Sequence, residues 1–208
     1  VYRDSITSLN SEGEEVLIAS NVFHDLYTSG LVLERSGGVV NFVHNTLDDM
    51  EHGVRQKRNS SYDVTVSNNI FSEMDEYLRV LETSAAREMR LNHNLMWNRG
   101  KDIVVRWGDK RTVRYGADID ALAGRSKRGN VVGDPRLPAG AAAGWVPGSG
   151  SAAIDAANED LAGLATGFRS RYPRSPSLLM DYAGRSREGC DADIGALEAA
   201  CVAGQPDE

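Results

Sequence analysis

The sequence contains little of what several protein classes require. Its two cysteines, Cys190 and Cys201, have no cysteine or histidine companions at the spacing of a zinc site. No apolar run approaches the roughly 20 residues that a membrane-spanning helix needs, so we expect no transmembrane segment. A net charge of −7 argues against binding to nucleic acid. The 41% of hydrophobic and 25% of charged residues are the proportions of a folded domain rather than a disordered chain.

What the sequence does contain is a repeat. Four segments share an asparagine that follows a polar residue and precedes a mostly apolar pair: "ASNVFHDL" at 19–26, "FVHNTLDD" at 42–49, "VSNNIFSE" at 66–73 and "NHNLMWNR" at 92–99. The shared residues are Asn21, Asn45, Asn69 and Asn94, and they are 24, 24 and 25 residues apart. A fixed period in this range indicates a solenoid.

Each repeat contains two short β-rich pieces. The first piece carries the asparagine, and the second follows a short polar link, as in "GLVLER" at 30–35, "GVRQKR" at 53–58, "YLRVLE" at 77–82 and "DIVVRW" at 102–107. Apolar residues tend to alternate within these pieces. We therefore expect coils whose strands pair in parallel with the next coil, about 4.8 Å away.

The asparagines are expected to form a ladder. Asn tolerates unusual backbone angles at a sharp turn and bonds to nearby backbone groups, and stacked Asn amides can bond to one another. The residues after each asparagine are expected to fill the interior: Val22/Phe23, Thr46/Leu47, Ile70/Phe71 and Leu95/Met96.

These repeats resemble the units of right-handed parallel β-helix proteins, the fold of many polysaccharide lyases, glycosidases, epimerases and phage tailspikes. Three later blocks, "VVGDPRL" at 131–137, "GSGSAAIDAA" at 148–157 and "DYAGRSREGCDADIGALE" at 181–198, resemble the C-terminal tail of secreted bacterial β-helix proteins. The chain departs from that tail at Ala152, where the family prefers Pro, and in the placement of Arg187. The resemblance implies an all-β, right-handed parallel β-helix in an extracellular, cell-surface or periplasmic location.

The predicted organisation is one domain in three parts. Residues 1–14 form an incomplete first coil, residues 15–108 form coils of about 24 residues, and residues 109–208 form closing coils and a C-terminal cap. The segment 114–130 predicts a short amphipathic helix, with Asp118 near its start and Gly124 at its end. Because residue 1 is Val and nothing before the first coil could cover it, we expect the C-terminal portion of a longer β-helix. The missing N-terminal portion would then be a second chain or a segment outside this sequence.

The two cysteines favour a disulfide in an oxidising compartment. The alternative is a pair of reduced, buried thiols. A Cys190–Cys201 bond would hold the tail with about 3 kcal/mol.

Alignment of the second pieces predicts a basic stripe on the outer face. If Leu31/Leu33, Val54/Gln56, Leu78/Val80 and Ile103/Val105 point inward, two columns point outward. One column is Val32, Arg55, Arg79 and Val104, and the other is Glu34, Lys57, Leu81 and Arg106. The strand ends add Arg35, Arg58, Glu82 and Trp107.

The stripe suggests an acidic polysaccharide as ligand, since arginine grips carboxylates bidentately. In a lyase, Lys57 would be the base that removes the C5 proton, its pKa lowered by neighbouring arginines. Arg55 and Arg79 would neutralise the uronate carboxylate. Glu34, Arg58 and Arg106 would contact the substrate, and Trp107 would stack on a sugar. The alternative is a set of ordinary ion pairs, because Glu34 and Lys57 are neighbours across coils.

Other polar groups point to weaker hypotheses. Calcium could bind outside the ladder through Asp25, Asp48, Asp49 and Glu73. The four histidines, His24, His44, His52 and His93, are too scattered for a metal triad, and His44 and His93 share a turn position before the ladder asparagine. A glycosidase needs two facing carboxylates, whereas the outward columns offer only Glu34. The sequence therefore leaves two functions open, a lyase-like enzyme and a non-catalytic binding, adhesion or structural module.

Overall fold

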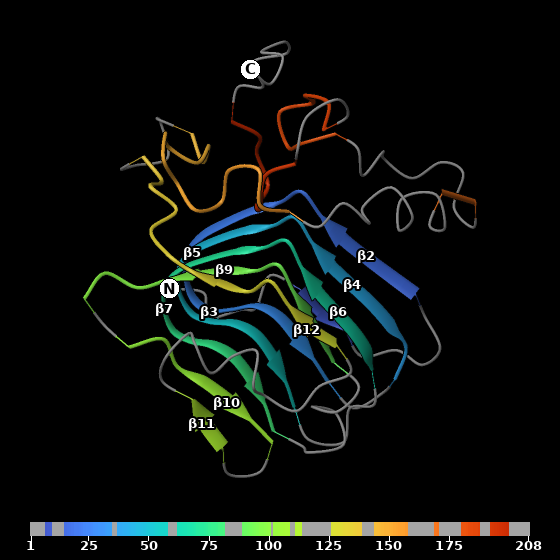
Figure 1. Ribbon diagram of the computed structural model, residues 1–208. Helices are drawn as coiled ribbons and strands as arrows, with labels where there is room; N and C mark the ends of the chain where they lie inside the picture. Colours follow the sequence, from blue (N-terminus) through green and yellow to red (C-terminus); the bar gives the residue numbers. More distant parts are fainter. Residues whose placement is uncertain are drawn as a thin grey trace.

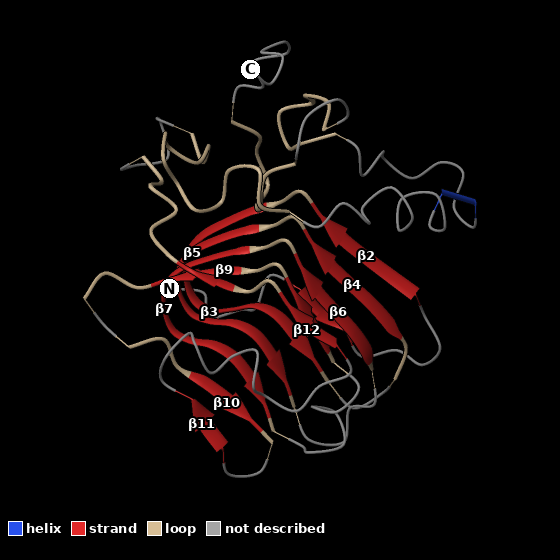
Figure 2. Ribbon diagram, in the orientation of Figure 1, coloured by secondary structure: helices blue, strands red, loops and turns tan. Residues whose placement is uncertain are grey.

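The chain folds into stacked parallel strands (Figures 1 and 2). The computed structural model describes residues 7–9, 15–34, 37–57, 62–81, 89–100, 102–108, 111–113, 126–138, 144–157, 169–170, 180–187 and 192–199. The strands in these ranges form two sheets. Named strands pair in parallel throughout, except for the hairpin between β10 and β11. The predicted parallel β-helix is confirmed.

Strands of the two sheets alternate along the chain, except that β9, β10 and β11 follow one another in the first sheet. The first holds β1 (Thr7–Leu9), β3 (Val22–Leu33), β5 (Thr46–Gln56), β7 (Ile70–Val80), β9 (Leu95–Trp97), β10 (Val105–Trp107), β11 (Arg111–Val113) and β13 (Val131–Val132). The second holds β2 (Glu15–Ala19), β4 (Val39–Val43), β6 (Asp63–Ser67), β8 (Arg90–Asn92) and β12 (Ser126–Arg128). We call each consecutive pair a rung: β2–β3, β4–β5, β6–β7, β8–β9 and β12–β13. The polar links expected inside each rung are absorbed into the long strands β3, β5 and β7.

The break within each rung falls at the asparagine, which confirms the ladder. The backbone N–H of Asn21 and its Nδ2 both donate to Oδ1 of Asn45, each over 3.0 Å. Asn45 donates in the same way to Asn69 at 2.9 and 3.0 Å. Asn69 in turn donates to Asn94 at 3.1 and 3.0 Å. Each carboxamide therefore supplies the acceptor that a turning backbone cannot offer to the rung before it.

A fifth asparagine extends the ladder. Asn94 donates through its backbone N–H and Nδ2 to Oδ1 of Asn130, at 3.1 and 3.0 Å. Asn130 donates onward to the carbonyl of Leu91 at 3.0 Å. The 36 residues between Asn94 and Asn130 exceed the repeat period, which is why periodicity alone did not identify it.

The strained backbone of the corner belongs to the residue before each asparagine, not to the asparagine as expected. Positive φ occurs at all five such positions: Ser20, His44, Asn68, His93 and Gly129. Only glycine adopts this conformation without a steric penalty from Cβ. The predicted turn role of His44 and His93 is confirmed, since both have φ near +50° (52° and 51°).

The pair after each asparagine divides between inside and outside. Phe23, Leu47, Phe71 and Met96 join the large buried core. Their predecessors cannot point the same way, because side chains alternate across a strand. Ile70 and Leu95 instead pack outside the coil against Ala153 and Ile194 of the tail. The expectation that both members of each pair face the interior is therefore wrong.

The described part of the tail lies along the outer side of the asparagine corner, where Figure 1 shows it in orange and red. It touches successive rungs. Ser20 Oγ donates to the carbonyl of Met180 at 3.3 Å, and the Ala196 N–H donates to Thr46 Oγ1 at 3.0 Å. The Gly195 N–H donates to the carbonyl of Asn68 at 2.9 Å. These contacts tie residues far apart in sequence to one edge of the solenoid.

Several sequence predictions fall partly or wholly outside the described residues. Cys190 and Cys201 both lie there, so the expected disulfide stays a prediction. Residues 114–125 of the expected helix lie there too, while 126–128 form strand β12. In the expected incomplete first coil, residues 7–9 form β1, which pairs with β3.

The ladder predicts a position-dependent cost of asparagine removal. Asn69→Ala leaves two donors of Asn45 without their acceptor, and each unsatisfied buried group costs about 1–3 kcal/mol. We expect a loss of about 3 kcal/mol in the free energy of unfolding, measured by urea denaturation. The matched control is Asn21→Ala, because no described ladder residue donates to Asn21. Its cost should be roughly half as large, and equal costs for the two variants would contradict a ladder that is stabilised by its middle members.

Candidate functional site

Three arginines form a column on the neighbouring strands β5, β7 and β10. Val32, Arg55 and Arg79 are register partners along β3, β5 and β7. The next member of the column is Arg106 on β10, paired with Arg79. We call Arg55, Arg79 and Arg106 the arginine column. The predicted adjacency of Arg55 and Arg79 is confirmed, and Arg106 stands beside Arg79 in place of Val104.

The register on β10 is two residues from the predicted one. Val105 pairs with Leu78 and Trp107 pairs with Val80, whereas the alignment had placed Ile103 and Val105 there. The chain between β9 and β10 accommodates the two extra residues. Side chains alternate along a strand, so Trp107 points into the core and is only 4% exposed. The expected sugar-stacking role of Trp107 is therefore wrong.

A buried acid and a buried histidine lie beside the arginine column. Ser29, His52 and Glu76 are register partners on β3, β5 and β7. Glu76 Oε1 lies 2.6 Å from Nε of Arg106, and its Oε2 lies 3.6 Å from Nε of Arg79. His52 Nε2 lies 3.1 Å from Nη1 of Arg79 and 3.4 Å from Glu76 Oε2. One carboxylate thus faces two of the three guanidinium groups.

Polar atoms of this group remain unsatisfied. Arg55 Nε, Arg79 Nε, His52 Nδ1 and Glu76 Oε2 are buried without a hydrogen-bond partner in the described part of the chain. Such groups normally find a partner in protein or ordered water. Burial lowers the pKa of His52, against the opposing effect of Glu51 and Glu76 and with a smaller contribution from Arg55 and Arg79 in the same direction. The ring is therefore neutral at pH 7, and the positive charge of the site belongs to the arginines.

Lys57 has an ion-pair partner outside the arginine column. It forms an ion pair with Glu34 across the rungs, with the lysine side chain 39% exposed and the glutamate 27%. This pairing agrees with the alternative that the two residues are ordinary neighbours. Arg58, together with Arg35 and Glu82, lies outside the described residues.

The carboxylates considered for calcium are spread along the first half of the long strands. Asp25, Asp49 and Glu73 all have positive φ, at 55°, 54° and 52°, and mark a bend in each strand. Burial raises the pKa of Asp48, a change that a hydrogen bond from Ser72 partly offsets. Across the described ranges, no three His, Cys, Asp or Glu side chains are close enough together to hold a metal ion.

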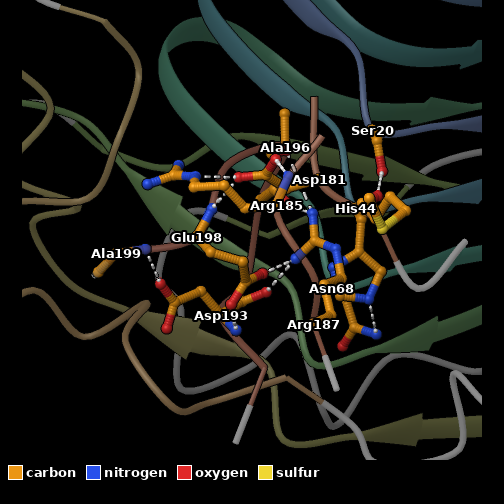
Figure 3. Close-up of polar contacts among 12 residues, drawn as sticks. Ser20, His44, Asn68, Asp181, Arg185, Arg187, Asp193, Ala196, Glu198 and Ala199 are labelled. Carbon is orange, nitrogen blue, oxygen red and sulfur yellow. Dashed lines mark hydrogen bonds and ion pairs between the residues drawn. The ribbon is translucent and has the colours of Figure 1, made fainter. Parts of the chain in front are cut away.

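A second cluster of charges lies within the tail, and all its members except Arg185 are buried (Figure 3). We call Asp181, Arg185, Arg187, Asp193 and Glu198 the tail cluster. The guanidinium of Arg187 pairs with Glu198 and donates to the carbonyls of Gly195 and Ala196 at 3.0 and 3.2 Å.

The carboxylates of the tail cluster bind backbone N–H groups. Asp193 accepts from Asp155 at 2.8 Å and from Ala199 at 2.5 Å. Asp181 accepts from Arg185 at 2.7 Å and from Glu198 at 3.0 Å. Glu198 Oε2 likewise accepts from the Asp193 N–H at 3.0 Å, so the three carboxylates stabilise the turns of the tail.

Burial dominates the ionisation of the tail cluster. It lowers the pKa of Arg187 to about 10, although Asp181 and Asp193 favour the charged form. It raises the pKa of Asp193, against hydrogen bonds from the Ala199 and Asp155 N–H groups. Arg187 stays charged at neutral pH, inside a network of acceptors that leaves only its Nε without a hydrogen bond.

His44 lies at the interface between corner and tail and is 1% exposed. Its Nε2 is 3.0 Å from Nδ2 of Asn68, an amide donor, so the ring proton is assigned to Nδ1. Burial holds the pKa of His44 well below its usual value, and the charge of Arg187 acts in the same direction. The backbones of Gly195 and Asp193 act in the opposite direction.

Several residues of the two sites were not predicted from the sequence, because the alternation of inward and outward side chains along the aligned strands does not identify them. His52 and Glu76 are register partners on β5 and β7, but each lies one residue before the aligned pieces at 53–58 and 77–82, so the alignment did not include them. The signal for Asn130 was its local context, since "GNVV" repeats the asparagine and apolar pair of "SNVF". Nothing in the repeat indicated that Arg187 would lie beside His44.

Family models, curated proteins and solved structures were compared with this chain, and none of them matches it. No helix in the described part of the chain is long and apolar enough to cross a membrane.

The tail cluster predicts a large difference between two neighbouring arginines. Removing one partner of a buried ion pair costs about 3–5 kcal/mol, because the other charge stays buried. We expect Arg187→Met to lower the free energy of unfolding by this amount in urea denaturation.

The matched control is Arg185→Ala, whose side chain is 42% exposed and pairs with Asp181. The Asp181 carboxylate is buried, but in this variant it keeps hydrogen bonds from the backbone N–H groups of residues 185 and 198, so we expect a smaller loss than for Arg187→Met. If Arg187→Met proved as mild as Arg185→Ala, Arg187 would not be the charge that stabilises the tail.

Proposed function

We propose that the protein binds an acidic, carboxylate-bearing polysaccharide along the arginine column. The observation that supports this most strongly is the imbalance of charge on the outer face. Three arginines are register partners on neighbouring parallel strands, whose backbones lie about 4.8 Å apart. Glu76 is the one carboxylate that contacts them within the described residues. Arg55 makes no ion pair with a described residue, and its buried Nε lacks a hydrogen bond.

Like charges at this separation repel one another unless a counter-ion offsets them. A uronate polymer supplies a carboxylate on every sugar, and a guanidinium binds a carboxylate through two parallel hydrogen bonds. The regular spacing of the column suits a ligand that is itself a repeat. Such a ligand belongs to an extracellular, cell-surface or periplasmic setting, which is the location we propose.

Binding should depend on individual members of the column. We expect Arg79→Ala to weaken the binding of polygalacturonate or alginate at least tenfold, since a charge-assisted hydrogen bond contributes about 1.5–3 kcal/mol. Isothermal titration calorimetry at two salt concentrations measures the effect. Glu76→Gln should strengthen binding, because it removes the internal carboxylate that competes for Arg79 and Arg106.

The matched control is Arg99→Ala, which removes the same charge from a side chain that is 88% exposed and lies away from the column. It should leave affinity unchanged. Equal weakening by Arg79→Ala and Arg99→Ala would mean that only net charge matters, and the site would be withdrawn.

A second candidate function is cleavage of the same polymer by β-elimination. The position of Lys57 supports this function. Lys57 lies two residues after Arg55, so its side chain points to the same face as that of Arg55. We expect an enzyme to produce unsaturated uronate ends, followed by their ultraviolet absorbance, and Lys57→Ala to abolish that signal. Binding without turnover would identify a non-catalytic binding or adhesion module.

The alternative of a structural module that pairs with an N-terminal β-helix portion has its own support. Within the described residues, β2 is the edge strand of the second sheet and β1 is an edge strand of the first. Further coils could pair with these two edges. Failure of all anionic polysaccharides to bind would favour this alternative.

A further inference from the structure

A titratable group, His44, lies where the corner of the solenoid meets the tail, and the proposed binding site does not include it. Five residues form the corner column: Ser20, His44, Asn68, His93 and Gly129. Of these, His44 is the one whose ring lies near Arg187. Figure 3 shows His44 and Asn68 drawn with the tail cluster.

We propose that residues 180–187 and 192–199 form an acid-releasable latch, which is held on the asparagine corner while His44 is neutral and is freed when its ring takes up a proton. Three observations support the proposal independently. They are the burial of the ring, the hydrogen bond that Nε2 accepts, and the cation placed next to it.

The hydrogen bond requires the neutral ring. Nε2 of His44 accepts from the Asn68 amide, 3.0 Å away. A protonated imidazole has a donor on both nitrogens, so the amide of Asn68 would have to turn over to meet it. The second proton would also bring a positive charge into a site that is closed to water.

The charges around His44 oppose its protonation. On the tail side, Arg187 faces the ring, and the backbone of Asp193 and Gly195 lies against it. On the solenoid side, the neighbouring corner residues Ser20 and Asn68 carry no charge. Glu198 is already paired with Arg187, and Asp181 with Arg185. No described carboxylate therefore contacts His44 to stabilise its cationic form.

The direction of the pH effect follows from linkage. The pKa of His44 is lowered in the docked state, so the released state binds the proton more tightly. Docking is at full strength above the ordinary histidine pKa of about 6.5 and weakens as the pH falls from there towards the lowered value. The pKa of Asp193 is raised, so protonation of this carboxyl acts in the opposite sense, above its ordinary value of 3.8.

Release can be followed at amides that join tail and solenoid. The N–H groups of Gly195 and Ala196 donate to the carbonyl of Asn68 and to Thr46 Oγ1, at 2.9 and 3.0 Å. Hydrogen exchange of these amides between pH 7.5 and 5, corrected for the intrinsic exchange rate, reports the docking equilibrium. We expect their protection to fall by up to about tenfold for each pH unit below 6.5.

Two histidine variants test the origin of this effect. His44→Asn removes the titrating ring and keeps a residue that tolerates positive φ, as Asn68 does on the next rung. Its protection should no longer change with pH in this range. His93→Asn is the matched control, because His93 occupies the same corner position but faces the carbonyl of Ala156 at 3.4 Å rather than Arg187. It should behave like the unmodified protein.

A second measurement needs no variant and covers the case in which His44→Asn fails to fold. The ring signals of His44 and the Gly195 amide can be followed together by nuclear magnetic resonance. We expect the ring to become charged at the same pH at which Gly195 loses protection. Protonation of His44 while Gly195 stays protected would overturn the proposal, as would equal pH dependence in His44→Asn and the unmodified protein.

Discussion

The structure depends on one repeated interaction, in which a carboxamide oxygen accepts two hydrogen bonds from the rung before it. Where the chain turns at the corner, the asparagine N–H cannot reach a strand partner. Oδ1 of the next asparagine serves as its acceptor and also accepts the side-chain Nδ2. The backbone returns the bond, because the N–H of Ile70 donates to the carbonyl of Asn45 at 2.9 Å. Every turn is thereby tied to its neighbours at one point, within a buried environment where an unmade hydrogen bond is costly.

The ladder also sets the register of everything that follows it. A slip of one residue would exchange the inward and outward faces of a strand, so a fixed corner fixes which side chains reach the outer surface. Two insertions show where the fold tolerates extra residues. Arg106 follows its register partner Arg79 by two residues more than the 25-residue spacing of the last repeat. Asn130 follows Asn94 by 36 residues, about a dozen more than one repeat. Both insertions lie after Asn94. The chain accommodates them away from the corner, and the ladder resumes unchanged at Asn130.

This explains what could be predicted from the sequence. The period of the asparagines predicted the parallel β-helix, four members of the ladder and the adjacency of Arg55 and Arg79, because all of these depend on local spacing. The insertion after Asn94 shifted Arg106 and Trp107, and spacing carries no information about where extra residues are accommodated. The orientation of Ile70 and Leu95 was missed for a different reason. Their outward face is apolar because the tail covers it, and contacts with a segment outside the repeats leave no periodic signal.

The two charged groups of the molecule differ in how completely they are satisfied. Arg187 is enclosed by a carboxylate and two backbone carbonyls, so it acts as a structural centre whose removal exposes unpaired acceptors. The arginine column, on the outer face, has fewer carboxylates than guanidinium groups and retains unpartnered nitrogens. Burial of a charge is tolerated where hydrogen bonds complete its shell. By the same reasoning, a row of cations that the fold leaves incompletely paired is where an anionic ligand gains most from binding. The tail cluster therefore explains how the tail is held in shape, and the arginine column is the place to look for a function.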